Sequence, residues 1–212
     1  EGNHYLKKDK KYLTKNKIII KKKYSLSEPY IFYPAQFWAH KNHIYLIQGL
    51  KKLEEKYKIK LNVIFSGGDK GNKSYIKEVA KNLSLKERVK FAGFVDNDEM
   101  IALYLQSIAL VMPSYFGPTN LPPLEAFELG VPVLYSDLPG LRDQVGKSAL
   151  LMDLKNPESM ADQLFKLLNQ SDLRNYLIAS GKERLKYFEN FNRFEVIYNI
   201  LKNFRYRNQC WK

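Results

Sequence analysis

The chain has 212 residues, 45% of them hydrophobic and 27% charged, which is typical of a globular protein and sufficient for one sizeable domain or two small ones. Its net charge is +13, and its single cysteine, Cys210, excludes an internal disulfide framework and favours a reducing, cytoplasmic location. No apolar run approaches the roughly 20 residues that a helix needs to span a bilayer, and no secretory signal is visible.

More than half of the excess positive charge lies in residues 1–24. This segment holds nine lysines against Glu1 and Asp9, which gives +7 of the +13. We therefore predict a Lys-rich leader or interdomain linker over residues 1–24 and one folded domain over residues 25–212. The leader can be a solvated linker, a segment drawn peripherally to the anionic inner face of a membrane, or a nucleic-acid arm, but no nucleic-acid motif accompanies the charge.

After the leader, short apolar runs alternate with helical patterns. The runs at 30–34, 61–66, 89–92, 109–112, 131–135 and 149–152 are predicted strands. Between the first two, Leu46, Leu50, Leu53 and Tyr57 repeat at helical spacing. This alternation predicts an α/β fold with a doubly wound, Rossmann-like parallel sheet, in which ligands bind beyond the C-terminal ends of the strands.

The last third of the chain is predicted to be helical. Asn156 and Pro157 form a capped helix start, a second helix is expected over about 172–188, and a third contains Phe194 and Phe204. These extra C-terminal helices follow the predicted sheet.

The most informative stretch joins the fourth and fifth predicted strands. Asn120 is a predicted N-cap, with Pro122 and Pro123 in the first turn, where a backbone N–H has no intrahelical partner. The N–H groups of Asn120 and Leu121 would then point from the positive end of a helix, a geometry that holds phosphate. Glu125 lies where its carboxylate can accept hydrogen bonds from a neighbouring diol. A diphosphate beside a ribose indicates a nucleotide-sugar, although a solvated glutamate on an ordinary helix is the alternative.

The run LPPLEAFELGVPV at 121–133 resembles the signature of the retaining glycosyltransferases of family 4, which have the GT-B fold. The similarity continues through Ser136, Asp137 and Gly140 and covers about residues 24–200, essentially one C-terminal, donor-binding half. It implies transfer of a hexose from a UDP- or GDP-sugar to a saccharide or lipid-linked acceptor, in bacterial surface polysaccharide synthesis. It also implies that no metal or other cofactor is needed, because helix dipoles and basic side chains stabilise the developing charge.

The resemblance assigns roles residue by residue. The family has G-R-x-x-x-x-K after the first strand; Lys41 matches the lysine, and Gln36 stands where the arginine would be. Lys41 and Glu125 are the predicted catalytic residues, on the departing diphosphate and the ribose. Phe94 and Val95 follow the third strand, where the family places the nucleotide base.

The main departure from the family is the loop before Glu125. Gly117 stands where the family has the first of two glutamates, which contacts the donor sugar. The Phe-Gly-Pro-Thr-Asn run at 116–120 resembles the loop of family members that assemble bacterial surface polysaccharides. The resemblance therefore implies a subgroup variant in which Thr119 and Asn120 are the neighbours of the sugar.

Two further features give only weak evidence for a binding site. His40 and His43 are three residues apart, but the only other histidine is His4, so no metal site is expected. The glycine-rich loop at 65–71 lacks the phosphate-binding patterns and favours a plain turn.

Three alternatives to the transferase stay open: a non-catalytic nucleotide-binding or regulatory module, a nucleic-acid-binding domain, and a sugar-nucleotide epimerase. The resemblance also implies that the acceptor is held by a missing N-terminal half. We therefore expect these 212 residues alone to bind nucleotide-sugar weakly and to transfer little, because transfer needs donor and acceptor in one water-excluded cleft.

Overall fold

The computed structural model of the chain describes residues 20, 22–117, 120–190 and 192–209. Most of the predicted leader, and the predicted sugar neighbour Thr119, lie outside the described residues. The described end of the leader packs onto the domain: Ile20 is buried, and the Tyr24 hydroxyl donates a hydrogen bond of 2.7 Å to Glu99.

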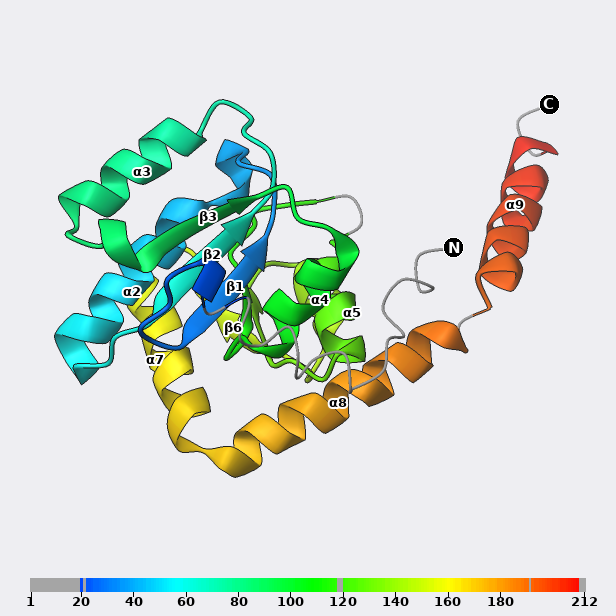
Figure 1. Cartoon of the computed structure of the whole chain (residues 1–212). Coiled ribbons are helices and arrows are strands. Elements are labelled where there is room, and N and C mark those ends of the chain that lie inside the picture. The colour runs from blue at the N-terminus through cyan, green and yellow to red at the C-terminus, as the bar shows by residue number, and fades with distance from the viewer. Residues whose placement is uncertain (1–19, 21, 118–119, 191, 210–212) are drawn as a thin grey trace.

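The centre of the molecule is a six-stranded sheet, and every strand pairing in it is parallel. Its strands are β1 (Tyr30–Pro34), β2 (Asn62–Ser66), β3 (Val89–Gly93), β4 (Leu110–Met112), β5 (Val133–Ser136) and β6 (Leu150–Met152). They lie in the order β3-β2-β1-β4-β5-β6, so the chain reverses its winding direction between β1 and β4 (Figure 1). The predicted doubly wound sheet is confirmed, and the reversal opens a crevice beyond β1 and β4, where ligands bind in such sheets.

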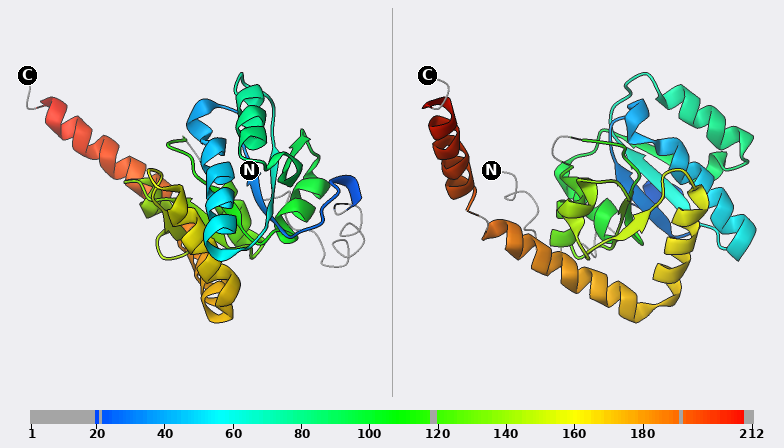
Figure 2. Two further views of the ribbon diagram at one scale, coloured as in Figure 1. Left: turned by 90° about the vertical axis from the view of Figure 1, so that its left-hand side faces the viewer. Right: turned by 180° about the vertical axis from the view of Figure 1, so that it is seen from behind.

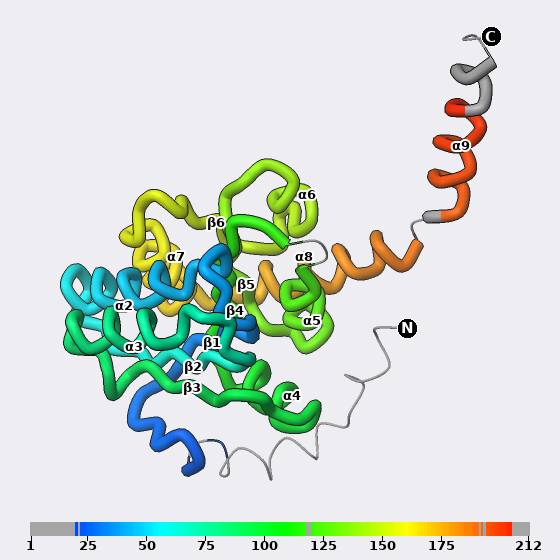
Figure 3. Tube along the Cα trace, turned by 90° about the horizontal axis from the view of Figure 1, so that it is seen from above, coloured from blue at the N-terminus to red at the C-terminus, as the bar shows by residue number. Residues whose placement is uncertain are grey.

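Helices cover both faces of the sheet (Figures 1 and 3). The helices are α2 (His43–Tyr57), α3 (Lys73–Asn82), α4 (Asn97–Leu105), α5 (Pro122–Glu128), α6 (Leu141–Val145), α7 (Pro157–Asn169), α8 (Ser171–Glu189) and α9 (Arg193–Gln209), with short 3-10 turns η1 (Ala39–Lys41) and η2 (Lys86–Arg88). Helices α2, α3 and α7 lie on one face, and α4 and α5 lie on the other. Helix α8 crosses from α7 to pack against α5.

The core is formed by strands that are buried on both faces. All residues of β2, β4 and β5 are buried, and β1 is buried up to its last residue. This explains why these strands read as continuous apolar runs and not as alternating ones. Aromatic rings fill much of the space, including Phe32, Tyr33 and Phe65, all fully buried.

The predicted C-terminal helices are present, but the last one leaves the body of the protein. Helix α9 projects away from the sheet domain at the far end of α8 (Figures 1 and 2). Its described apolar side chains, such as Phe194 and Leu201, are exposed. Within the described parts of the chain, every helix is too short or too polar to cross a bilayer.

Candidate functional site

A continuous cleft lies beyond the C-terminal ends of the central strands. It consists of two adjoining hollows of about 430 and 540 Å³. The first is lined by Pro34, Ala35, Gln36, Lys41, Met112, Asn120, Leu121 and Pro122; the second by Pro34, Ala35, Gln36, Ser66, Gly67, Gly93, Phe94, Val95, Asp96, Asn97, Met100, Pro122 and Glu125. Four residues line both hollows, so the two form one site. The structure brings together seven of the eight predicted site residues; the eighth, Thr119, lies outside the described residues.

The floor of the cleft requires a close approach of three strand ends. Gly67 has φ of +141°, and a Cβ on it would lie 2.4 Å from the Ala35 carbonyl oxygen. Its N–H donates to Gly93 O at 2.8 Å, and Ala35 N–H donates to Ser66 O at 2.9 Å. Only glycine fits at position 67. The beginning of the glycine-rich loop is therefore part of the site, whereas Asp69 forms the expected turn by accepting the N–H of residue 71.

Lys41 brings a positive charge to the first hollow. It ends η1, which is held by hydrogen bonds from Tyr33 Oη to Lys41 O, 3.0 Å, and from Tyr115 N to His40 O, 3.0 Å. Burial lowers the pKa of the Lys41 amine. No carboxylate among the described residues forms an ion pair with it. An anion entering this hollow would meet a partly desolvated ammonium that lacks a described counterion.

The predicted N-cap at Asn120 is wrong. Helix α5 begins at Pro122, its N-cap position is Leu121, and no side chain caps it. The reason is chemical: a side chain at Asn120 would have to cap the N–H of residue 122 or 123, and proline has none. The Leu121 carbonyl instead accepts from Leu124 at 2.8 Å and from Glu125 at 3.1 Å. The helix has seven residues, so Lys41, and not the helix end, is the main source of positive charge here.

Asn120 nevertheless belongs to the site. Its backbone has φ of +41°, and Gln144 Nε2 donates to its carbonyl oxygen at 2.9 Å. The residue is 7% exposed, and its Oδ1 has no hydrogen-bond partner among the described atoms. A Cβ at Gly117 would lie 2.1 Å from this oxygen and 3.1 Å from Lys41 Nζ. Glycine at 117, where the resembling family has glutamate, is therefore required by the position of the Asn120 amide.

Glu125 lines the second hollow from the first turn of α5. Its Oε2 accepts a hydrogen bond of 2.8 Å from Tyr104 Oη, and Tyr104 is fully buried with its ring edge-on against Phe32, 5.0 Å between centroids. Burial, and then the Glu125 charge, raise the pKa of Tyr104 well above its ordinary value, so the hydroxyl stays a donor. The carboxylate is thereby oriented by a rigid neighbour, and it lines the second hollow, whereas Lys41 lines the first.

The loop after β3 forms the outer wall of the second hollow. Phe94 is 97% exposed, and Val95 follows it. Asp96 caps α4 by accepting the N–H of Glu99 at 2.8 Å. The exposed ring of Phe94 at the rim offers an apolar surface for a planar group.

Gln36 connects the two hollows, since it lines both. Its Oε1 accepts a hydrogen bond of 3.0 Å from Trp38 Nε1. This bond uses the amide oxygen and directs the amide NH₂, which carries only donors, to other partners.

His40 and His43 lie in different surroundings. His43 is fully buried among Tyr33, Phe37 and Phe65, with ring centroids 4.8 to 5.0 Å away, whereas His40 stacks on Phe116. Burial lowers the pKa of His43 to about 4. Among the described residues no three His, Cys, Asp or Glu side chains are placed to share a metal ion.

Sequence reasoning missed several members of the site. Tyr104, Ser66, Gly67 and Asp96 were not predicted, although Ser66 ends a predicted strand and Gly67 and Asp96 follow the C-terminal ends of predicted strands. That position was the available signal. Tyr104 gave no signal of its own, because its helical spacing with Met100 is that of any core residue.

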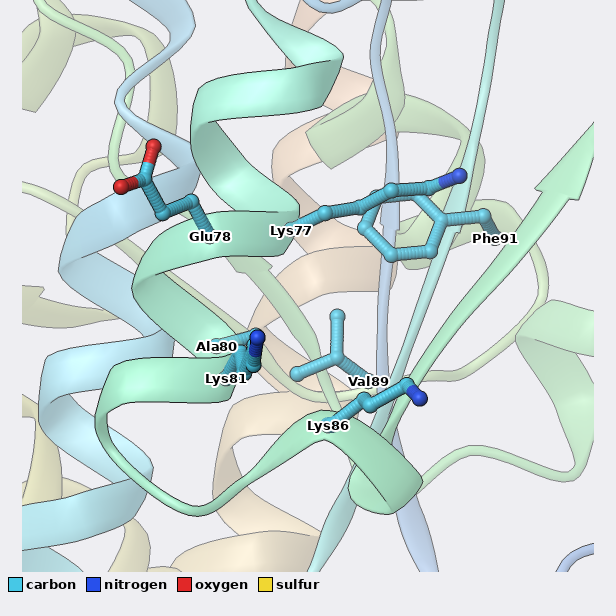
Figure 4. A pocket seen from close by; sticks show the side chains of 7 residues that line it. All are labelled: Lys77, Glu78, Ala80, Lys81, Lys86, Val89 and Phe91. Atoms are coloured by element: carbon cyan, nitrogen blue, oxygen red, sulfur yellow. The ribbon is translucent and has the colours of Figure 1, made fainter.

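A separate cavity of about 600 Å³ lies between α3 and the edge strand β3 (Figure 4). Lys77, Lys81 and Lys86 surround a floor that includes Val89 and Phe91, and Lys77 Nζ lies 5.5 Å from the Phe91 ring centroid. None of the predicted site residues lines it. It is a hollow between solvated lysine side chains, and it does not connect to the cleft through any lining residue.

Comparison with known proteins extends this picture. The sequence profile of the family described as "Glycosyl transferases group 1" matches residues 14–184. An uncharacterized glycosyltransferase of Methanocaldococcus jannaschii is 29% identical over 158 residues, 74% of this chain and 40% of that protein. O-antigen chain mannosyltransferase B of Escherichia coli is 25% identical over 167 residues, 78% of this chain and 44% of that protein. The chain thus spans less than half the length of these relatives.

Solved structures share the fold. TarM of S. aureus, crystallised with UDP among its ligands, superposes with a TM-score of 0.68 at 17% identity, over 82% of this chain and 35% of that one. At this level of identity the similarity concerns the fold alone.

Proposed function

Because the chain belongs to the glycosyl transferases group 1 family, we propose that it is the C-terminal, donor-binding half of a retaining GT-B glycosyltransferase of family 4. The donor is a UDP- or GDP-hexose, and the acceptor is a saccharide or a lipid-linked saccharide of a bacterial surface polysaccharide. One observation carries the proposal: a partly desolvated ammonium, Lys41, and an oriented carboxylate, Glu125, line two adjoining hollows of one cleft beyond the sheet.

The cleft has the polarity of a nucleotide-sugar. Lys41 binds the diphosphate and stabilises the charge that develops on it as the sugar departs, with the N–H groups of Asn120 and Leu121 at the edge of the same hollow. Glu125, held by Tyr104, accepts hydrogen bonds from the ribose hydroxyls. Phe94 and Val95 border the base, and Gln36 lines both hollows, where its amide can donate to a phosphate oxygen. Asn120, which lines the first hollow, and Thr119 are the proposed neighbours of the sugar.

The relatives support the class of reaction. One is named an O-antigen chain mannosyltransferase, and a protein of the same fold was crystallised with UDP. No step of the proposal needs a metal, since Lys41 supplies the charge at the leaving group. The acceptor is held by the other half of the enzyme, and the 212 residues alone transfer little.

A thermal-shift panel of UDP, GDP, ADP and their sugar conjugates tests the proposal. Preferential binding to the folded state raises its apparent stability, so one nucleotide series should raise the melting temperature more than the others. Glu125→Ala should weaken nucleotide binding by about 1.5–3 kcal/mol, roughly 10- to 150-fold, because a charge-assisted hydrogen bond is lost.

Glu128→Ala is the matched control, since Glu128 carries the same charge on the same helix but is exposed. It should leave nucleotide affinity unchanged. Equal affinities in the wild type and the Glu125 variant would contradict the ribose role, and no response to any nucleotide would contradict the donor site.

A further inference from the structure

Three aromatic rings stack on the surface beside the cleft. The imidazole of His40 lies parallel to the ring of Phe116, with centroids 4.3 Å apart and planes at 14°. Trp38 stacks toward His40 at 6.3 Å and 22°. We call these residues the aromatic platform. Trp38 is 44% exposed and Phe116 60% exposed, so the rings are not core residues.

The platform is attached to the cleft on the side of Lys41. The Trp38 indole donates to Gln36, which lines both hollows, and His40 immediately precedes Lys41. On the other segment, Phe116 immediately precedes Gly117, and a Cβ built on Gly117 would lie 3.1 Å from Lys41 Nζ. The platform therefore adjoins the hollow in which the proposed leaving group is held.

Two segments far apart in the sequence are tied together to form the platform. Tyr115 N–H donates to His40 O at 3.0 Å, and Ser114 Oγ donates to the Phe116 carbonyl at 2.8 Å. Ser136 Oγ, from β5, donates to Ser114 O at 2.7 Å. The rings are thus held in place before any ligand arrives, which lowers the entropic cost of binding.

The chemistry of the rings matches that of a pyranose. A sugar ring has apolar C–H faces and a polar rim of hydroxyl groups, and exposed aromatic rings offer apolar faces with polar edges in Trp and His. Burial and the neighbouring charge of Lys41 lower the pKa of His40, so its ring is uncharged at neutral pH and can both donate and accept. Exposed apolar surface next to a ligand cleft commonly marks an extension of the binding site.

We propose that the aromatic platform binds a pyranose ring of the acceptor saccharide and presents it to the donor held at Lys41. This inference rests on the proposed function and adds to it an acceptor contact supplied by this chain. It also means that part of the acceptor site does not depend on the missing half.

Tryptophan fluorescence tests the platform directly. The chain has two tryptophans, and Trp211→Phe leaves Trp38 as the only one. The full 212-residue chain with this substitution is titrated with methyl α-D-mannopyranoside and methyl α-D-glucopyranoside, with and without UDP. We expect a saturable change in Trp38 emission for at least one glycoside. Phe116→Ala should weaken this binding roughly three- to tenfold, because one stacked face is lost.

Two controls separate the platform from the donor site and from loss of folding. Tyr75→Ala removes an equally exposed aromatic ring on α3 and should leave glycoside binding unchanged. The UDP-induced thermal shift should persist in Phe116→Ala.

The outcomes distinguish the two proposals. If UDP still raises the melting temperature but no glycoside changes the emission, the proposed acceptor contact is contradicted. It is also contradicted if Phe116→Ala binds glycoside as tightly as the parent does. If glycoside binding is found but no nucleotide shifts the melting temperature, the proposed function fails and the platform stands as a saccharide site. If Phe116→Ala abolishes only the rise in melting temperature caused by UDP, the rings position Lys41 and the acceptor role is wrong.

Discussion

At the scale of single residues, the cleft depends on polar groups whose positions are set by buried neighbours. Glu125 is held by a tyrosine that is itself fixed in the core, and Asn120 occupies the space that a side chain at 117 would need. Such groups are preorganised, which makes them sensitive to substitutions that do not touch a ligand.

Gly117→Ala tests the coupling between Gly117 and Asn120. The added Cβ would lie 2.1 Å from Asn120 Oδ1, so the amide must move away. We expect a loss of about 1–3 kcal/mol in stability to urea, because the loop is overpacked. In an Asn120→Ala background the same change should cost clearly less, since the clashing oxygen is gone.

Gly68→Ala is the control for this experiment, because a Cβ there meets nothing within 4 Å. It should change stability little. If Gly117→Ala costs the same with and without Asn120, the two residues are not coupled.

The buried imidazole of His43 should make the protein sensitive to acid. Its pKa is about 4 in the folded state, because burial and then Lys41 disfavour the charged form, against about 6.5 when unfolded. Between these values the unfolded state binds more protons, so stability falls as the pH is lowered from 6.5 to 4. The shift corresponds to about 3 kcal/mol.

His43→Phe should remove this part of the pH dependence, since a phenyl ring fits among the surrounding aromatic rings and does not titrate. Urea unfolding at a series of pH values between 7 and 4 measures it. Parallel stability curves for the wild type and the variant would show that His43 does not contribute.

At the scale of elements, two helix pairs approach closely through glycine. Helix α8 meets α5 at Gly181, where a Cβ would lie 2.7 Å from Cδ1 of the buried Phe127 ring. Helix α2 meets α7 at Gly49, where a Cβ would lie 2.7 Å from the sulfur of Met160. The two contacts differ in what must move, a rigid ring in one case and a flexible thioether in the other.

We therefore expect Gly181→Ala to lower the urea midpoint more than Gly49→Ala. Overpacking against the ring costs about 1–3 kcal/mol and exceeds the gain of about 1 kcal/mol in helix propensity. At Gly49 the methionine thioether can change rotamer, which leaves only the Met160 Cβ contact of 3.2 Å, so the cost is smaller. Equal midpoints for the two variants would show that α5 and α8 can separate without loss.

At the scale of the whole molecule, the sheet domain and α9 differ in how far their apolar side chains are buried. Every described apolar side chain of α9 is exposed, and the helix projects from the body (Figure 2). The exposed side chains are Phe194, Val196, Ile197, Tyr198, Ile200, Leu201 and Phe204. An element with so few buried contacts adds little to the stability of the domain.

Removal of residues 190–212 should therefore leave the melting temperature within about 2 °C of the full chain. It should also reduce concentration-dependent association in light scattering, because exposed apolar patches promote it. Replacing Ile197 and Leu201 by Lys in the full chain should have the same effect on association. A fall of many degrees on truncation would show that α9 is part of the folded core.

The sequence was sufficient to predict most of the fold and the location of the cleft, because the signals for both are local. Apolar runs and helical spacing predicted six strands and a parallel, doubly wound sheet, and the positions of Lys41 and Glu125 after their strands placed both in one cleft. In a parallel sheet the strand ends meet at one edge, so position along the chain predicts position in space. The error at Asn120 was also local, since two prolines remove the donors that a side-chain cap requires.

Tertiary structure decided what depends on distances between segments that no local pattern relates. The hydrogen bond from Tyr104 to Glu125, the exclusion of a side chain at Gly67 by Ala35 and the stacking of His40 on Phe116 each join residues from different loops or helices. Composition and periodicity report which face of an element is apolar, but they carry no information on which side chains meet across the crevice between β1 and β4. The direction of each side chain in the cleft follows from packing, and only the folded chain determines it.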